Sequence, residues 1–327
     1  MSEFELLARV RERLPAPGPR VLTGSGDDAA ITLPGGVTAT SVDALVEGVH
    51  FRREHSSLAQ IGHKALATAL SDLAAMAAGP GEAYVVLGVP TDLDEDGCIE
   101  VLDGIVALAS ATGTSLVGGD VTRAPVLMLA VTVVGHSSSP EELVTRSGAQ
   151  PGDALVLTGE IGAAAAGLAL LEQPGAGDAV PASTAERLRA RHLEPQPRIE
   201  AGRALAQAGA TAMIDLSDGL GGDGSRLAEA SGVGLRVNTG SLPIADGVGE
   251  LAAATGQEAA RLAVSGGEDY ELLATLPPDR FESARSAVEK AGGIALTKIG
   301  EAIEGEGVEI RLPGGELLKP SGFDQLG

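Results

Sequence analysis

Short apolar segments with strand character alternate irregularly with helical segments along this chain, and glycine- and proline-rich turns separate them. Helices are expected at residues 2–14, 60–78, 95–111, 162–172, 198–208, 222–231 and 280–291. Strands are expected at residues 37–43, 82–89, 115–117, 126–135, 154–158, 213–216, 235–238 and 270–276. Such irregular alternation favours an α+β or mixed α/β fold over a regular parallel barrel. The stretch 173–182, rich in Gly, Pro and Ala, is expected to be a mobile loop.

The length of the chain, 327 residues, predicts two domains, because one hydrophobic core rarely grows beyond ~250–300 residues. The run Ser137-Ser138-Ser139-Pro140 precedes further turn signals and has the composition of a domain boundary. We therefore predict domains at residues 1–140 and 141–327. Aromatic residues make up only 2% of the chain, so Ala, Val, Leu and Ile must fill both cores.

The formal net charge of −22 argues against binding to nucleic acid or to an anionic membrane surface, both of which require basic patches. The longest apolar stretches, Val126–Val134 and Ala163–Leu171, fall short of the ~20 residues of a membrane span. The N-terminal residues show no signal-peptide pattern, and the single cysteine, Cys98, cannot form an internal disulfide. A cytoplasmic location is expected.

Acidic residues recur beside glycine or serine at the ends of the predicted strands. They occur in Gly26-Asp27-Asp28, Ser41-Val42-Asp43, Gly118-Gly119-Asp120, Asp215-Leu216-Ser217-Asp218-Gly219 and Gly266-Gly267-Glu268-Asp269. One such pair is usually only a turn. Their recurrence suits a hard divalent cation, which takes oxygen ligands and which glycine allows the backbone to approach closely.

Asp72 differs from these residues because it lies inside an apolar helical segment, with apolar neighbours at 69, 70, 73, 74, 76 and 77. A carboxylate at a buried face needs a partner. It is therefore either a metal ligand or a hydrogen-bonded aspartate of the core.

Together these carboxylates indicate a Mg²⁺ site shared with a phosphorylated ligand, since Mg²⁺ commonly bridges protein carboxylates and substrate phosphates. A chain this acidic could bind a polyanion such as ATP only through cations. The sequence has no P-loop, no protein-kinase motif, no Gly-x-Ser-x-Gly elbow and no zinc-type histidine spacing.

Seven segments, in the same order, resemble the thiamine-monophosphate kinase family, and the match extends from Phe4 to Phe323. They are Gly26-Asp27-Asp28-Ala29-Ala30; Ser41-Val42-Asp43 with Glu47-Gly48-Val49-His50-Phe51; Ser71-Asp72-Leu73-Ala74-Ala75-Met76; Gly118-Gly119-Asp120-Val121-Thr122-Arg123; Thr145-Arg146-Ser147-Gly148-Ala149; Ile214-Asp215-Leu216-Ser217-Asp218-Gly219-Leu220; and Ser265-Gly266-Gly267-Glu268-Asp269-Tyr270-Glu271-Leu272.

The resemblance implies a two-domain fold like that of aminoimidazole ribonucleotide synthetase, with an N-terminal sheet domain that forms a homodimer and a C-terminal α+β domain. It also implies the transfer of the γ-phosphoryl group of ATP onto thiamine monophosphate, without a general base. The implied Mg²⁺ ligands are Asp27, Ser41, Val42 through its carbonyl, Asp43, Asp72, Asp120, Asp215 and Asp218. The implied ATP contacts are Gly119, Asp120, Arg146 and Ser217, and those of thiamine monophosphate are His50, Glu268 and Phe323.

The chain departs from the family pattern at two places. Many members carry a tyrosine against adenine in the helix before Gly-Gly-Asp, whereas Val101–Ala109 has no aromatic residue and Leu102 takes that place. The chain also ends in Gln325-Leu326-Gly327, where the family often has His and an aromatic residue. Two alternatives stay open, namely another ATP-using member of the superfamily and a non-catalytic sensor of nucleotides or thiamine phosphates.

Overall fold

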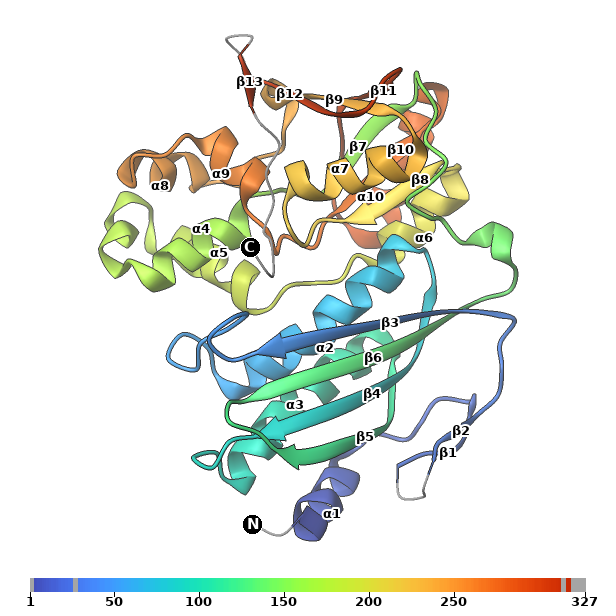
Figure 1. Ribbon diagram of the computed structural model, residues 1–327, viewed down its shortest axis with the longest axis vertical. Coiled ribbons are helices and arrows are strands. Elements are labelled where there is room, and N and C mark those ends of the chain that lie inside the picture. The colour runs from blue at the N-terminus through green and yellow to red at the C-terminus, as the bar shows by residue number, and fades with distance from the viewer. Residues whose placement is uncertain (1–2, 26–28, 313–315, 319–327) are drawn as a thin grey trace. The chain divides into compact units, whose positions relative to one another are not determined.

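The computed structural model describes residues 3–25, 29–312 and 316–318. The chain divides into two compact units, each with its own large sheet (Figure 1). Unit 1 contains Met1–Leu73 and Ala78–Pro140, and unit 2 contains Ala74–Ala77 and Glu141–Gly327. The expected mixture of helices and strands in a two-part chain is confirmed.

Unit 1 is a four-stranded sheet with the strand order β3-β6-β4-β5, and it also has a small β1-β2 ladder. Its elements are α1 (Glu3–Arg13), β1 (Val21–Thr23), β2 (Ile31–Thr32), β3 (Val37–Val46), α2 (Leu58–Ala75), β4 (Gly79–Val89), α3 (Glu95–Thr112), β5 (Ser115–Arg123) and β6 (Met128–Ser137). β6 pairs antiparallel with β3 and β4, and β4 pairs parallel with β5. Helices α2 and α3 cover one face of the sheet (Figure 1).

Helices α2 and α3 touch backbone to backbone through two glycines. A Cβ atom on Gly62 would lie 1.9 Å from the carbonyl oxygen of Val101, and one on Gly104 would lie 1.8 Å from that of Ala59. Both distances are far below van der Waals contact, so only glycine allows the helices to approach this closely. Helix α3 ends at Gly113, which adopts the left-handed conformation (φ 72°), as the sequence predicted.

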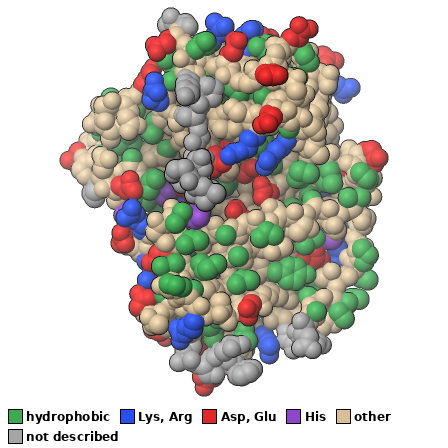
Figure 2. Space-filling model, viewed as in Figure 1, with side chains coloured by type: hydrophobic (Ala, Val, Ile, Leu, Met, Phe, Trp, Pro, Cys, Tyr) green, Lys and Arg blue, Asp and Glu red, His purple; other side chains and the backbone are tan. Residues whose placement is uncertain are grey.

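The other face of this sheet is open and largely apolar. Along β3, side chains alternate between half-buried and exposed, and Val42 on the open face is 67% exposed. The cross-strand neighbours of Val42 and Ala44 continue this face onto β6 and β4, where Val86 is also exposed. Figure 2 shows hydrophobic side chains gathered over these strands. Such a contiguous apolar surface is typical of an interaction site.

Unit 2 is built on a seven-stranded sheet with the order β13-β12-β9-β11-β7-β10-β8, in which only β12 and β9 pair in parallel. Its strands are β7 (Ala154–Thr158), β8 (Ala212–Asp215), β9 (Gly234–Asn238), β10 (Leu272–Leu276), β11 (Leu296–Ile303), β12 (Gly307–Arg311) and β13 (Leu317–Leu318). Its α-helices are α4 (Ala163–Glu172), α5 (Ala182–Leu193), α6 (Ile199–Ala208), α7 (Leu220–Ser231), α8 (Val248–Ala254), α9 (Ala259–Ser265) and α10 (Phe281–Gly292), and its 3-10 turns are η1 (Pro140–Glu142), η2 (Pro174–Ala179), η3 (Thr239–Ser241) and η4 (Pro278–Arg280).

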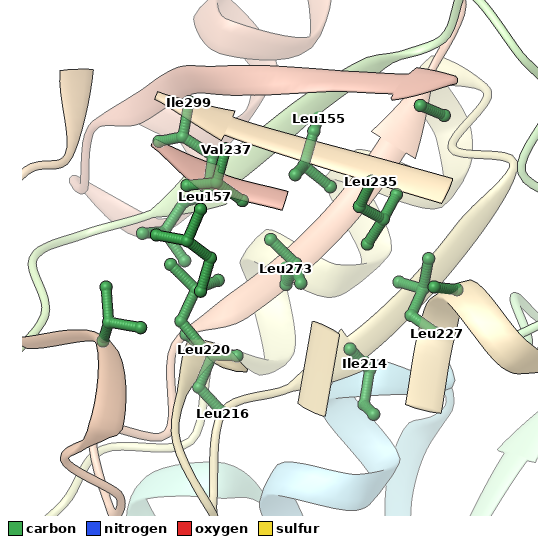
Figure 3. Packing of buried hydrophobic residues seen from close by; sticks show 14 of the residues in the cluster. Leu155, Leu157, Ile214, Leu216, Leu220, Leu227, Leu235, Val237, Leu273 and Ile299 are labelled. Carbon is green, nitrogen blue, oxygen red and sulfur yellow. The ribbon is translucent and has the colours of Figure 1, made fainter. Parts of the chain in front are cut away.

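The central strands of unit 2 are buried on both faces, and alternate residues enter different cores. Leu155 and Leu157 of β7 pack with α7 and α9, as Figure 3 shows for the two leucines and their neighbours. Ala154 and Val156 pack on the opposite face with α6 and α10. This explains why β7 reads as a continuous apolar run in the sequence.

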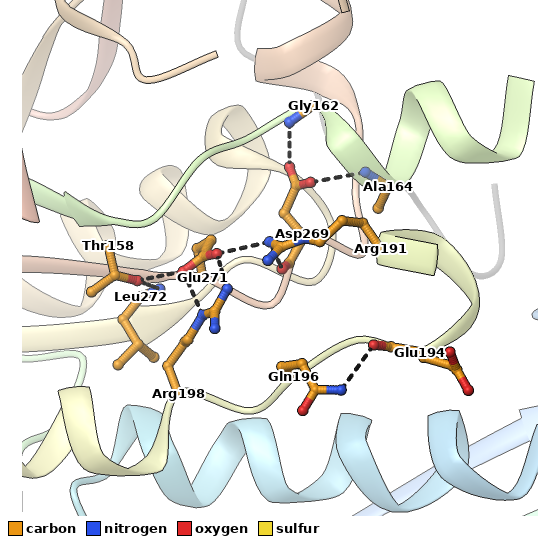
Figure 4. Close-up of polar contacts among 10 residues, drawn as sticks. All are labelled: Thr158, Gly162, Ala164, Arg191, Glu194, Gln196, Arg198, Asp269, Glu271 and Leu272. Atoms are coloured by element: carbon orange, nitrogen blue, oxygen red, sulfur yellow. Dashed lines mark hydrogen bonds and ion pairs between the residues drawn. The ribbon is translucent and has the colours of Figure 1, made fainter. Parts of the chain in front are cut away.

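Helices α4, α5 and α8 form a third apolar cluster, and the start of α4 is capped from a distant loop. The buried carboxylate of Asp269 accepts hydrogen bonds from the backbone N–H groups of Gly162 (2.8 Å) and Ala164 (3.2 Å), as Figure 4 shows. Desolvation raises the pKa of Asp269 to about 7, although these two hydrogen bonds oppose the rise.

Several sequence-based boundaries were wrong. Strand β5 continues to Arg123 rather than ending at Val117, because it pairs with β4 along its length. Strand β10 begins at Leu272 rather than Tyr270, since Glu268 and Tyr270 have positive φ and cannot join a ladder. The stretch 173–182, which was expected to be a mobile loop, contains the 3-10 turn η2 (Pro174–Ala179). Among the described residues, eight further helices and strands were not predicted, namely α5, α8, α9, β1, β2, β11, β12 and β13.

Among the helices of the described part of the chain, none combines the length and the hydropathy that crossing a membrane would require.

The contact between α2 and α3 predicts that G104A destabilises the protein. The added methyl group would overlap the carbonyl of Ala59, and overpacking of this kind costs about 1–3 kcal/mol. We expect the melting temperature to fall by about 5 °C in scanning calorimetry. The matched control is G249A on α8, where nothing lies within 4 Å of the added Cβ. That variant should melt at or slightly above the wild-type temperature, since alanine favours helix. Equal melting temperatures for the two variants would contradict the close contact.

The burial of Asp269 predicts a pH-dependent contribution to stability. Its folded-state pKa of about 7 lies above the unfolded value of 3.8, so the native state holds the extra proton between these values. The contribution is therefore fully present below about pH 4 and is lost as the pH rises through about 7. The free energy of unfolding of the wild type, minus that of D269N, should fall over this range in denaturant titrations. The exposed D279N serves as the control and should show no such trend. A difference that stays flat or rises would refute the assignment.

Candidate active site

The middle of strand β3 carries the first group of predicted site residues. Ser41 and Asp43 are half-buried on one side of the strand, and the Val42 side chain is exposed on the other. The hydroxyl of Ser41 donates a short hydrogen bond to Oδ2 of Asp72, which projects from α2. The tertiary structure thus brings together an aspartate of a helix and a serine of a strand, 31 residues apart in sequence.

β3 is an outer strand of the four-stranded sheet, so one backbone edge has no ladder partner in the described part of that sheet. The carbonyl of a residue such as Val42 can therefore serve as a ligand without breaking a strand pair. Just after β3, the chain turns, and Nδ1 of His50 accepts a hydrogen bond from the backbone N–H of Val46 (3.1 Å). This bond fixes the tautomer of His50 with its proton on Nε2.

Gly119 and Asp120 lie on β5, the outer strand at the opposite edge of the same sheet. Three strand spacings separate β5 from β3, or about 14 Å at the usual distance between neighbouring strands. One copy of unit 1 therefore does not bring Asp120 close enough to share a single ion with Asp43 and Asp72. A Cβ atom on Gly119 would lie 2.0 Å from the carbonyl oxygen of Val85, which explains the need for glycine here.

An apolar pocket adjoins Gly119 and Asp120. Side chains from α1, α3, β4 and β5 line it, and it is partly open to solvent. Leu102 forms part of the wall, and none of the described lining residues is aromatic. The pocket has the apolar lining of a site for a flat ring system.

In unit 2, strand β8 ends with Asp215, and the loop after it carries Ser217 and Asp218. Asp215 is buried, and the other two are half-buried. The carboxylate of Asp218 forms an ion pair with Arg226 (2.6 Å). The backbone N–H of Asp218 donates a hydrogen bond to the buried carboxylate of Asp223 (2.9 Å). Burial raises the pKa of Asp223 to about 6. Arg226 and Asp223 were missed from the sequence, although their i, i+3 spacing on α7 is typical of a helical ion pair.

Arg146 lies beside the same strand. The carbonyl of its neighbour Thr145 accepts a hydrogen bond from the backbone N–H of Met213 on β8 (2.9 Å). The hydroxyl of Ser231 donates to the carbonyl of Arg146 (2.9 Å). The backbone of Arg146 is thereby held, while the residue as a whole is exposed to solvent, as a residue that contacts a ligand would be.

The loop that carries Glu268 packs directly against the loop that carries Ser217. The backbone N–H of Glu268 donates to the carbonyl of Ser217 (2.8 Å), and that of Tyr270 donates to Leu216 (2.9 Å). A Cβ atom on Gly267 would lie 2.4 Å from the carbonyl oxygen of Ser217. The structure thus brings Ser217 and Glu268 together, two residues that the sequence analysis placed in one site.

Two residues at the end of α5 were missed, because the sequence analysis did not predict this helix. Nδ1 of His192 lies 3.0 Å from Oε2 of Glu268. Arg191 donates to the backbone carbonyl of Asp269 (3.3 Å) and to the carboxylate of Glu271 (2.7 Å). The one signal in the sequence for these two residues is that they are basic and follow an amphipathic stretch, as basic residues often do in the last turn of a helix.

Two predicted site residues, Asp27 and Phe323, lie outside the described residues. Within the described ranges, no three side chains of Asp, Glu, His or Cys gather closely enough to hold a metal ion by themselves. Ser41, Asp43, Asp72 and Asp120 belong to unit 1, and Arg146, Asp215, Asp218 and Glu268 belong to unit 2.

The chain resembles known proteins along almost its whole length. Residues 26–137 match the family described as AIR synthase related protein, N-terminal domain, and residues 150–313 match the corresponding C-terminal domain. Thiamine-monophosphate kinase of Salmonella typhimurium is 40% identical over 306 residues, which cover 92% of this chain and 90% of that protein.

Two solved structures share the fold. The crystal structure of thiamine-monophosphate kinase from Stenotrophomonas maltophilia superimposes with a TM-score of 0.85 at 36% identity, covering 97% of this chain and 98% of that one. AaThiL complexed with AMPPCP and TMP gives a TM-score of 0.77 at 27% identity, covering 98% and 96%. Given the identity and coverage of these matches, the chain belongs to the thiamine-monophosphate kinase family.

Proposed function

We propose that this protein phosphorylates thiamine monophosphate with ATP, giving thiamine diphosphate and ADP. The observation that carries the proposal is the packing of the loop of Ser217 and Asp218 against the loop of Glu268. A residue assigned to ATP thereby lies beside a residue assigned to thiamine monophosphate. A member of the same family binds AMPPCP, an analogue of ATP, together with TMP.

The reaction requires little acid–base chemistry from the protein. An oxygen of the phosphate of thiamine monophosphate attacks the γ-phosphorus of ATP, and the bond to the oxygen between the β- and γ-phosphorus atoms breaks. The attacking group is already an oxyanion near neutral pH, so no general base is needed. The side chains act by positioning the two phosphate groups and by compensating their charge.

We propose that Asp27, Ser41, the carbonyl of Val42, Asp43, Asp72, Asp120, Asp215 and Asp218 hold several Mg²⁺ ions. All of these ligands are oxygen donors, as this ion prefers. When bound, Mg²⁺ neutralises phosphate charge. One contact supports the assignment, because Ser41 and Asp72 already touch. The carboxylate of Asp218 is paired with Arg226, and an ion bound there would share it with that side chain. Since Asp120 lies on the opposite outer strand from Asp43, these two aspartates serve different ions within one copy of the chain.

For ATP, we propose contacts from Gly119, Asp120, Arg146 and Ser217, with adenine in the apolar pocket beside Leu102. A pocket without an aromatic residue among its described lining holds the base by aliphatic packing on its faces. For thiamine monophosphate, we propose His50, Glu268 and Phe323. The carboxylate of Glu268 suits the cationic thiazolium or the aminopyrimidine, and an aromatic ring such as that of Phe323 can stack on either.

We propose that the protein is a cytoplasmic homodimer that pairs the open apolar faces of two four-stranded sheets. The exposed valines of this face, Val42 and Val86, support this assembly, because burying them removes apolar surface from water. The net charge of −22 argues against nucleic acid as a partner. It is compatible with small anionic substrates that bind to the protein through cations.

The direct test is to mix the protein with ATP, Mg²⁺ and thiamine monophosphate and to follow thiamine diphosphate. Asp43→Asn removes a proposed ligand charge and should lower kcat at least about 100-fold, the cost typical of losing one electrostatic contact to the transition state. The exposed D279N should leave the rate unchanged. Circular dichroism should show both variants folded.

A near-normal rate for D43N at saturating Mg²⁺ would refute the ligand assignment. If the wild type forms no thiamine diphosphate but still binds ATP and thiamine monophosphate, the protein is a non-catalytic sensor.

The proposed dimer predicts that V86K dissociates it. A lysine at the centre of the paired faces would bury an uncompensated charge, which is strongly unfavourable. We expect a change from dimer to monomer in analytical ultracentrifugation. V126K is the matched control, because Val126 is 38% exposed and Val86 is 37% exposed, but Val126 lies in the turn before β6. A wild-type monomer, or a V86K dimer as stable as that of V126K, would contradict the interface.

A further inference from the structure

A cluster of charged side chains holds the loop of residues 266–271 from one side. The carboxylate of Glu271 is fully buried. It accepts hydrogen bonds from Arg191 (2.7 Å), from two nitrogens of Arg198 (2.8 and 2.5 Å) and from Thr158 (2.8 Å), as Figure 4 shows. A Cβ atom on Gly159 would lie 2.3 Å from this carboxylate, so the protein leaves space for this group and little else. The reaction proposed above gives none of these groups a role.

The same loop has a backbone conformation that side chains rarely adopt. Glu268 and Tyr270 have φ values of 65° and 50°, in the left-handed region that favours glycine. Such conformations persist only where the surroundings hold them, and they are commonest at functional sites. Here the surroundings are the charged cluster at Glu271, the cap of Asp269 on α4 and the backbone hydrogen bonds to residues 216–217.

The last turn of α5 touches this loop at two adjacent residues. Arg191 donates to the backbone of Asp269 and to Glu271, and its neighbour His192 lies 3.0 Å from the carboxylate of Glu268. The His192 side chain is only 7% exposed, whereas that of Glu268 is 26% exposed. Glu268 can therefore meet a ligand, while His192 reaches the site only through Glu268.

We propose that the last turn of α5 positions the substrate carboxylate of Glu268. Arg191 holds the backbone of the loop, and His192 holds the Glu268 side chain in one orientation. His192 is a positioning residue and does not touch substrate. This inference rests on the proposed function, because it assumes that Glu268 binds thiamine monophosphate.

Close packing within the helical cluster explains how α5 can act as a rigid support. A Cβ atom on Gly167 of α4 would lie 2.1 Å from the carbonyl oxygen of Leu188 of α5. Leu188 belongs to the same apolar cluster as Leu170 of α4, and both are buried. Helix α4 is in turn capped by Asp269, one residue after Glu268. The loop and the two helices therefore hold each other in place.

The test compares three substitutions of His192. The amide nitrogen of asparagine can occupy the place of Nδ1, whereas that of glutamine matches Nε2, and leucine offers no polar atom. H192L and H192Q should raise the KM for thiamine monophosphate about tenfold, the effect of losing one polar contact with a charged group. H192N should restore the KM to within about threefold of wild type. The KM for ATP should not change, and the melting temperature should stay near that of the wild type.

The double variant H192L/E268Q separates positioning from general destabilisation. If His192 acts through Glu268, H192L should add nothing to the effect of E268Q on the KM for thiamine monophosphate. If H192L does not fold, the comparison of H192N with H192Q carries the test alone. Equal KM values for H192N and H192Q, a matching rise in the KM for ATP, or additive effects in the double variant would overturn the proposal.

The failure of the proposed function would look different. In that case the wild type would form no thiamine diphosphate at all. Calorimetric titration of the same variants with thiamine monophosphate then measures affinity without turnover. H192N should bind at least about threefold more tightly than H192Q, and equal affinities, or no binding by the wild type, would overturn the inference.

Discussion

The buried carboxylate of Glu271 is the interaction on which the candidate site of unit 2 depends. Two arginines and a threonine satisfy it, and it fixes the start of β10 beside β7 and β8. The residues before it then have to turn back, which places Glu268 and Tyr270 in the left-handed region. Removing one partner of such a buried network leaves a charge uncompensated. The loss of any one of these side chains therefore destabilises the whole cluster. The loop of Ser217 packs on this fixed backbone.

Close approach of backbones replaces large side chains throughout this chain. With aromatic residues at 2%, the protein packs through glycine and alanine instead, as between α2 and α3 at Gly62 and Gly104. The same device operates in the site, where Gly267 meets the carbonyl of Ser217. Glycine therefore serves stability in one place and the geometry of the site in the other.

The acidity of the chain is compatible with anionic substrates because its site acids already have partners. Ser41 donates to Asp72, and Arg226 neutralises Asp218, while Asp223 holds the backbone of Asp218. These contacts orient the carboxylates before any ligand binds, which lowers the cost of reorganisation when charge is introduced. The remaining acids lie mainly on the surface and favour solubility.

The sequence by itself determined the elements whose pattern is local. It predicted β7 with its observed bounds, the end of α3 at Gly113, the mixed two-part architecture and the acidic turns that identify the family. Only the tertiary structure decided which distant residues meet. It placed Asp120 across the sheet from Asp43, paired Asp218 with Arg226 and set His192 against Glu268. The physical reason is the sequence distance over which each interaction acts. Periodicity and capping act within a few residues, whereas strand order and contacts across 76 positions, as from residue 192 to residue 268, arise only when the whole unit packs.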